Sequence, residues 1–166
     1  MKTIDINCDL GEGIGNDELI MPYISSANIA CGYHAGDEKT MKQTVELCKK
    51  YSVAVGAHPS YPDKENFGRT DMLLHPGEIY EMIVKQINCL EKIAAAADVP
   101  IHHVKPHGAL YNMAARSKEL AEAIAPHLKG VTVLTDRDDK LLARKIARTA
   151  LSKLPPTWCE APRQSP

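Results

Sequence analysis

Four short segments of this chain share one design, in which an apolar run ends at acidic or basic side chains and is followed by glycine or proline. They are Ile4–Gly13 (IDINCDLGEG), Ala27–Asp37 (ANIACGYHAGD), Val53–Ser60 (VAVGAHPS) and Ile101–Gly108 (IHHVKPHG). Short apolar or alternating runs bounded by turn residues are typical of strands. The pattern therefore predicts four strand ends, and we expect their polar side chains to point at one common site.

The stretches between these strands have the apolar spacing of helices. Helices are predicted over Glu38–Lys50, Gly77–Ala97, Lys118–Leu128 and Asp138–Leu154, and a fifth strand over Val131–Thr135. Strand and helix alternate, which predicts an α/β fold with a parallel sheet and right-handed crossovers. Such sheets bind ligands at the carboxyl ends of their strands, where the polar segments lie. The long polar loop Pro59–Thr70 is predicted to be a lid or binding segment.

The bulk composition excludes several classes of protein. The chain has 166 residues and a formal net charge of -1, which argues against a general electrostatic grip on nucleic acid. No apolar run reaches the ~18 residues of a membrane span, and none resembles a signal peptide. The five cysteines are odd in number and form no C-x-x-C pair, unlike a secreted disulfide framework. We expect a cytoplasmic protein without nucleic-acid or membrane partners, with one domain over 1–154 and a disordered proline-rich tail over 155–166.

The candidate functional residues come from these strand ends. Two carboxylates, Asp9 and Glu12, lie in a glycine-rich turn and are candidate acids, bases or metal ligands. Three histidines at three different strand ends are hard to explain by packing alone, and these are His34, His58 and His107. Lys105 directly follows a buried strand, so we expect either a lowered pKa or a carboxylate partner.

Two chemistries fit this set of side chains, and the spacing does not decide between them. A carboxylate and histidines, such as Asp9, His34 and His58, could hold Zn²⁺ or another divalent ion that activates water. Alternatively, the lysine, histidines and carboxylates could bind an anionic substrate and run acid–base chemistry without metal. Arg69 could pair with such an anion. The sequence has neither an HExxH motif nor a P-loop.

Four motifs in this order resemble the LamB/YcsF family of 5-oxoprolinase subunits. They are NCDLGEG, SSANIACGYHAGD, GAHPSYPDKENFGR and HVKPHGALYN, and the resemblance covers about Ile4 to Leu128. It implies a (β/α) barrel-like parallel sheet of the polysaccharide-deacetylase type, incomplete here at about five strands. It also implies ATP-dependent hydrolysis of the 5-oxoproline lactam to L-glutamate, carried out together with subunits B and C.

Carried over by motif, the resemblance implies a cleft lined by the polar residues found at the strand ends. We expect Asp9, Glu12, Lys105 and His107 to be catalytic, and Asn7, His34, His58 and Arg69 to bind substrate. Either Asp9 or Glu12 would act as general base, and the histidines would orient the lactam or a metal. Lys105 would stabilise negative charge that develops on oxygen.

The chain also departs from the family pattern. Members of the family continue beyond this length, and the resemblance is expected to fade from about Thr135. We therefore expect a truncated barrel with open sheet edges, low stability and weak activity or none. The alternatives are a metal-dependent deacetylase or amidohydrolase, by analogy of fold, and an inactive remnant.

Overall fold

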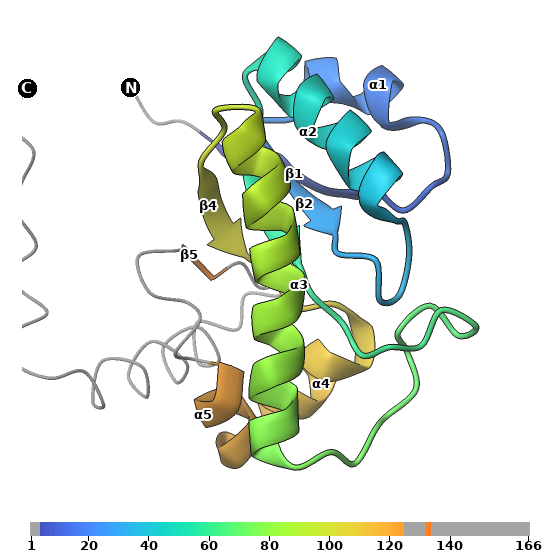
Figure 1. Cartoon of the computed structure of the whole chain (residues 1–166), viewed down its shortest axis with the longest axis vertical. Helices are drawn as coiled ribbons and strands as arrows, with labels where there is room; N and C mark the ends of the chain where they lie inside the picture. Colours follow the sequence, from blue (N-terminus) through green and yellow to red (C-terminus); the bar gives the residue numbers. More distant parts are fainter. Residues whose placement is uncertain (1–3, 125–131, 134–166) are drawn as a thin grey trace, which may run out of the picture.

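The protein contains a parallel sheet whose strands follow one another in space in the order in which they occur along the chain (Figure 1). The computed structural model describes residues 4–124 and 132–133. Its strands are β1 (Asn7–Leu10), β2 (Ser26–Ala30), β3 (Ala54–His58), β4 (Ile101–Val104) and β5 (Thr132–Val133). All four neighbouring pairs are parallel. The predicted α/β fold is confirmed. In the described residues the barrel is not closed, because β1 and β5 each pair with a single strand.

The helices that connect the strands were largely predicted by their apolar spacing. They are α1 (Asp17–Ile20), the 3₁₀ turn η1 (Met21–Tyr23), α2 (Glu38–Tyr51), α3 (Pro76–Ala96), α4 (Gly108–Arg116) and α5 (Lys118–Ile124). Among the described residues, none of the helices combines the length and apolar character that a membrane span requires. The predicted helix Asp138–Leu154, the tail 155–166 and the boundary between the two predicted regions lie outside the described residues.

Helix α2 begins and ends where local chemistry favours it. The Asp37 side chain accepts a hydrogen bond from the Thr40 backbone N–H at 2.8 Å, as expected of an N-cap. The C-cap residue, Ser52, has left-handed backbone. Helix α3 begins with Pro76 and a reciprocal cap between His75 and Glu78. These signals fix the helix ends and therefore the lengths of the loops that leave the strands.

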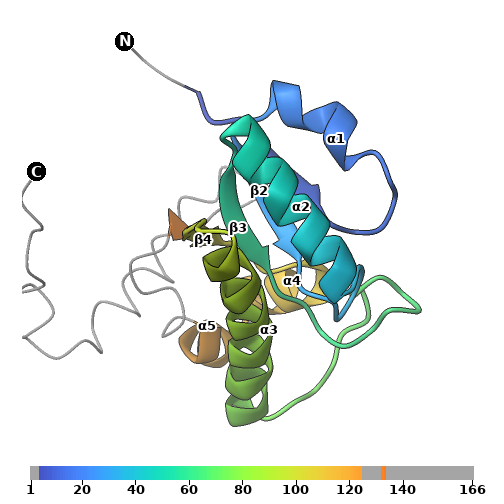
Figure 2. The ribbon, with the colours of Figure 1, turned by 45° about the horizontal axis from the view of Figure 1, so that its top comes forward.

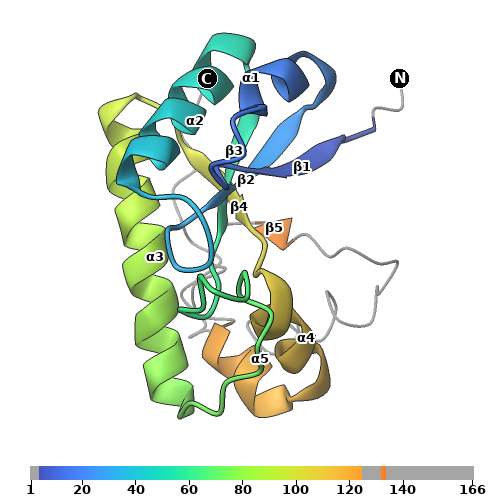
Figure 3. The same cartoon turned by 90° about the vertical axis from the view of Figure 1, so that its right-hand side faces the viewer.

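Helices α2 and α3 cover one face of the sheet and lie against each other (Figures 1 and 2). The side chains between these helices and the sheet are apolar and fully buried, and include Ile29, Val45, Val55, Ile79 and Ile83. Figure 3 views the same arrangement from the side, with α4 and α5 below the strands. The apolar core therefore lies between the sheet and α2 and α3.

The other face of the sheet is polar. Asp9, Asn28, Gly56 and His103 form one row across β1 to β4, because each is the register partner of the next. The His103 ring crosses over Gly56 to place its Nε2 2.7 Å from the Asn28 side-chain oxygen. A Cβ on Gly56 would lie 2.0 Å from that ring nitrogen, so the row requires glycine at this position. Hydrogen bonds within this row connect His103 to Asn28 and Asn28 to Asp9. They help to position Asp9 near the carboxyl ends of the strands.

Candidate functional site

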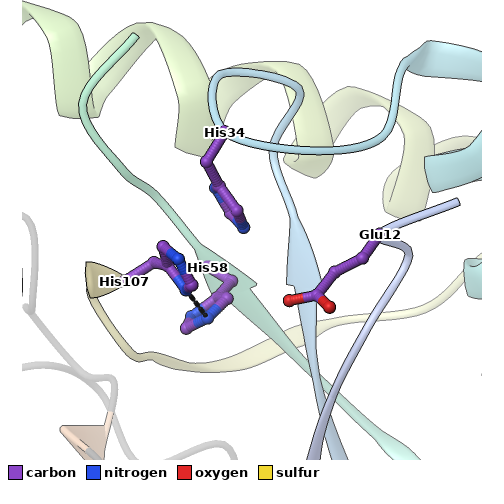
Figure 4. A group of neighbouring side chains, drawn as sticks. All are labelled: Glu12, His34, His58 and His107. Carbon is purple, nitrogen blue, oxygen red and sulfur yellow. Dashed lines mark hydrogen bonds between the residues drawn. The ribbon is translucent and has the colours of Figure 1, made fainter. Parts of the chain in front are cut away.

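The polar residues predicted at the strand ends meet at one edge of the sheet. Asp9 lies on β1, His58 ends β3, Lys105 follows β4 and His107 immediately precedes α4. Glu12 and His34 come from the loops that follow β1 and β2, and Figure 4 shows Glu12 beside the three histidines. Segments far apart in the sequence thus form a single cluster.

The side-by-side course of two chain segments beyond β3 and β4 explains why the histidines meet. The Lys105 N–H donates to the Ala57 carbonyl, and the His107 N–H donates to the Pro59 carbonyl, both at 2.9 Å. The parallel pairing is in effect prolonged past the strand ends. It brings the His107 ring next to His58, with Nδ1 of His107 2.9 Å from Nε2 of His58.

An ion pair between Asp9 and Lys105 lies next to the histidines. Lys105 Nζ is 3.0 Å from both carboxylate oxygens of Asp9. Asn28 also donates to Asp9, at 2.6 Å. Lys105 is nearly buried, at 7% exposure, so it has the carboxylate partner that the sequence predicted. Burial acts to raise the pKa of Asp9, but the His58 charge and the hydrogen bonds from Asn28 and Lys105 outweigh it and lower that pKa.

Two of the three histidines are anchored to backbone carbonyls. His58 Nδ1 lies 2.5 Å from the Lys105 carbonyl oxygen, and His107 Nε2 lies 2.8 Å from the Phe67 carbonyl oxygen. The His34 ring stacks on His107, with centroids 4.0 Å apart and planes at 7°. Both His34 nitrogens are buried and have no hydrogen-bond partner among the described residues.

The histidines lie in an environment that favours their neutral forms. Burial, together with the charges of His107 and His58, lowers the pKa of His34 to about 3. Burial is also the largest cause of the lowering of the pKa of His58, to about 4, and of the lowered pKa of His107. Neutral imidazoles are nitrogen ligands for divalent transition metals and hydrogen-bonding groups for a substrate.

Glu12 is the second carboxylate of the site and differs from Asp9. Partial burial, followed by the charges of Asp9 and Asp17, raises the pKa of Glu12. The residues able to hold a metal ion are Glu12, His34, His58 and His107, whose ligand atoms all lie within 4.8 Å of one another. The sequence suggested Asp9, His34 and His58. Asp9 is not in the group found here. Its Oδ2 lies 3.5 Å from His58 Nε2, but Lys105 and Asn28 already bind its carboxylate.

The loop between β3 and α3, predicted to be a lid or binding segment, closes one side of the cluster. Phe67 has positive φ and packs its ring edge-on to His34 and His107. Gly68 follows with φ +68°, and a Cβ there would lie 2.8 Å from the Cβ of His34 and 3.0 Å from the His107 ring. Glycine therefore lets the loop approach both rings. Buried Gln86 of α3 holds the start of the loop through both backbone groups of Ser60.

Two predicted site residues lie at the margin of the cluster. Asn7 is set back along β1 and bonds Ser26 and Asn28 rather than the histidines. Arg69 is exposed at the rim, with its guanidinium carbon 5.6 Å from the centre of the Phe67 ring. Its charge acts on both Glu12 and His107. An anion held by Arg69 would thus lie near the histidines, whereas Asn7 is linked to Asp9 through Asn28.

Several residues of the site were not predicted from the sequence. Asn28, Gly56 and His103 build the supporting row, and Phe67 supplies both a carbonyl and a ring. Their only signals were an asparagine and a glycine inside apolar strands, and an N-F-G turn in the loop. Isolated glycine within a strand marks close approach of another group, which is its role at Gly56.

Comparison with known proteins agrees with the fold and the motifs. A match to the LamB/YcsF family spans residues 4–152, past Leu128 and Thr135, where the resemblance was expected to end and to fade. That expectation was wrong. A protein from Bacillus cytotoxicus, named as the A subunit of 5-oxoprolinase, is 55% identical over 130 residues, covering 75% of this chain and 52% of the relative. One of the same name from Shouchella clausii is 52% identical over 156 residues, covering 91% and 59%.

A solved structure gives the same result. The lactam utilization protein from Thermus thermophilus has a TM-score of 0.79 and 42% sequence identity, covering 88% of this chain and 64% of that one. The chain spans about half the length of the curated relatives it matches. The described strands and the site they carry therefore correspond to part of those proteins.

Proposed function

Because this chain belongs to the LamB/YcsF family, we propose that it carries the lactam-hydrolysing site of a 5-oxoprolinase. The reaction is the ATP-dependent opening of 5-oxoproline to L-glutamate, performed in a complex with subunits B and C. The names of the relatives, which speak of a 5-oxoprolinase and of lactam utilization, support this substrate. The observation that carries the proposal is the single cluster of acids, neutral imidazoles and a buried ammonium at the strand ends.

Glu12 is the general base of the proposed reaction. Asp9 is unsuited to that role because both of its oxygens face the Lys105 ammonium and one also accepts from Asn28. Glu12 has no hydrogen bond or ion pair to any of the described residues, and its carboxylate faces the three histidines (Figure 4). A carboxylate placed in this way can accept a proton from a water that attacks the lactam carbonyl.

Lys105 stabilises the negative charge that develops on the lactam oxygen, and Asp9 holds the lysine in place. An ammonium fixed in a poorly solvated site stabilises an oxyanion more strongly than one in water. Arg69, at the rim, binds the carboxylate of 5-oxoproline. The histidines line the place where the substrate ring would lie, and Glu12 returns the proton it took from water to the ring nitrogen as the C–N bond breaks.

The glycine-rich turn between β1 and α1 is a poor site for the phosphates of ATP. The glycine-rich turn after β1 leads into α1 and has the composition of a phosphate-binding loop. However, the Gly11 N–H already donates to the Asp17 carboxylate at 2.9 Å, and Glu12 and Glu18 add negative charge nearby. Carboxylates repel phosphate, so this turn is unsuited to ATP.

A second candidate is metal-dependent amide hydrolysis or deacetylation, favoured by the four metal-capable side chains. The substrate distinguishes the two: turnover of 5-oxoproline supports the first reaction, and release of acetate from an N-acetylated substrate supports the second. In either case Glu12 is next to the reacting group.

The test of the proposed function is turnover of 5-oxoproline by the complex reconstituted with variants of this chain. We expect Glu12→Gln to lower kcat at least ~100-fold, in the range typical of a lost general base. His102→Ala, a change at an exposed histidine of β4, serves as the control and should leave kcat unchanged. If Glu12→Gln stays within tenfold of the wild type, Glu12 is not the base.

A further inference from the structure

The tautomers of the histidines, that is, which ring nitrogen carries the hydrogen, limit what the cluster can bind. A carbonyl oxygen can only accept a hydrogen bond, so the ring nitrogen facing it must carry the hydrogen. His58 Nδ1 and His107 Nε2 are therefore the protonated nitrogens, because they face the carbonyls of Lys105 and Phe67. In the neutral rings the other two nitrogens, His58 Nε2 and His107 Nδ1, carry lone pairs.

These two lone pairs point at each other. The nitrogens are 2.9 Å apart, a distance at which two lone pairs repel unless a positive charge lies between or beside them. A shared proton would supply that charge for His58 and His107. It would leave His34 unexplained, since both of its nitrogens are buried without a partner in the described part of the chain. One cation facing all three rings would meet the lone pairs of His58 and His107 and one of the two nitrogens of His34.

We propose that His34, His58 and His107 bind one divalent transition-metal ion of the zinc class, with the Glu12 carboxylate beside it. Three imidazoles are a ligand set that suits zinc, cobalt, nickel or copper far better than magnesium or calcium. A metal-bound histidine usually donates its other ring N–H to a carboxylate, a backbone carbonyl or water. Both anchors are present here, at His58 and His107.

The dimensions of the cluster suit such an ion. Zinc binds histidine nitrogen at about 2.0–2.1 Å in tetrahedral geometry, which separates neighbouring ligand atoms by about 3.3 Å. The ligand atoms here lie within 4.8 Å of one another. To complete the site, the His34 ring must also rotate out of its parallel stack with His107, because a ligating imidazole holds the ion near its own ring plane. Glu12 needs no ion to be solvated because it is only partly buried. The proposal places it beside the ion as the base, with the fourth position of the ion left to water.

The proposed ion would occupy the site to which the proposed function assigns the lactam chemistry. A direct measurement of metal binding tests the metal site separately from that reaction. The full chain, purified without a polyhistidine tag and treated with a chelator, is titrated with Co²⁺ and then with Zn²⁺. We expect one equivalent of Co²⁺ to give the intense visible absorption of a four-coordinate ion, and Zn²⁺ to displace it. Mg²⁺ should not compete.

Variants identify the ligands. His34→Gln, His58→Gln and His107→Gln keep most of the side-chain volume, and each should weaken Co²⁺ binding at least a hundredfold. Glu12→Gln should change it less than tenfold, and the exposed control His102→Ala not at all. Circular dichroism establishes that each variant is folded, and the wild-type titration is informative even if one is not.

The proposal is overturned if the wild type binds no Co²⁺ at one equivalent, which is the result expected of a proton shared by His58 and His107. It is equally overturned if the three glutamine variants bind as the wild type does. Binding of one equivalent together with full turnover by Glu12→Gln would support the metal site and defeat the assignment of Glu12 as base. The two proposals can therefore fail independently.

Discussion

The ion pair between Asp9 and Lys105 should be strongly coupled, and a double-mutant cycle can measure that coupling. Lys105→Met removes the ammonium and keeps the apolar stem, whereas Asp9→Asn removes the charge and keeps the shape. The two charges are 3.0 Å apart. At an effective dielectric constant of 20 their attraction is about 5 kcal/mol before the cost of desolvation is subtracted.

The net value is smaller than this attraction. Breaking a fully buried pair by removing one partner costs about 3–5 kcal/mol. Lys105 is nearly buried here, but the Asp9 side chain is 33% exposed, and Asn28 and His58 remain to solvate it in part. We therefore expect Lys105→Met to lower the free energy of unfolding by about 2–3 kcal/mol, with a coupling energy of about 2 kcal/mol in the cycle.

The assay is urea unfolding of the wild type, both single variants and the double variant at pH 7. The chain offers a matched control in the exposed pair of Lys50 and Glu18, 2.8 Å apart with both side chains about 60% exposed. Many such surface pairs contribute nothing measurable. If the Asp9–Lys105 cycle gives no more coupling energy than the Lys50–Glu18 cycle, the Asp9–Lys105 ion pair does not stabilise the fold as argued here.

The effect of Lys105→Met on the free energy of unfolding should depend on pH in a direction that the pKa of Asp9 predicts. The pKa of Asp9 is lowered from its ordinary value of 3.8, so its ionised form stabilises the fold above that pH. This stabilisation is lost as the pH falls through the lowered folded value. In Lys105→Met the pKa of Asp9 is lowered less, because the ammonium is missing. The variant therefore has less stability to lose as the pH falls. The difference between wild type and Lys105→Met should therefore narrow below about pH 4.

Two further predictions concern the elements that support the site. Gly56→Ala should lower the free energy of unfolding by about 2–4 kcal/mol, because the new Cβ would lie 2.0 Å from the His103 ring. Urea unfolding should show a smaller cost in a His103→Ala background, and an equal cost there would mean that the clash is not the cause. Gln86→Leu should cost about 2–4 kcal/mol, because it leaves both backbone groups of Ser60 without their partner. Lys85→Leu, on the exposed side of α3, should stay within about 0.5 kcal/mol, and similar costs for the two variants would contradict the role of Gln86.

The sequence was informative wherever the relevant signal is local. Short apolar runs ending in polar residues predicted strand ends, and the alternation with helices predicted the parallel sheet and hence the meeting of Asp9, His34, His58, Lys105 and His107. The expectation that Lys105 needs a carboxylate followed from its position after a buried strand, and Asp9 supplies it. Each of these inferences requires only a residue and its near neighbours in the chain.

The features that could not be predicted from the sequence depend on contacts between strands. The register that aligns Asn28, Gly56 and His103 is set by the packing of the whole sheet, so the sequence could not show that these residues form one row. For the same reason it could not choose between Asp9 and Glu12 as the carboxylate beside the histidines. Helix α4 was missed because proline and glycine near its start indicate a turn.

The most direct test of the central claim is a crystal structure of the protein with 5-oxoproline bound. The lactam carbonyl should lie within hydrogen-bonding distance of Lys105, with Glu12 and the three histidines around the ring and Arg69 near the substrate carboxylate. Binding at another place, such as the surface hollow of about 880 Å³ beside α2, with no ligand contact to Lys105 or to the histidines, would contradict the account.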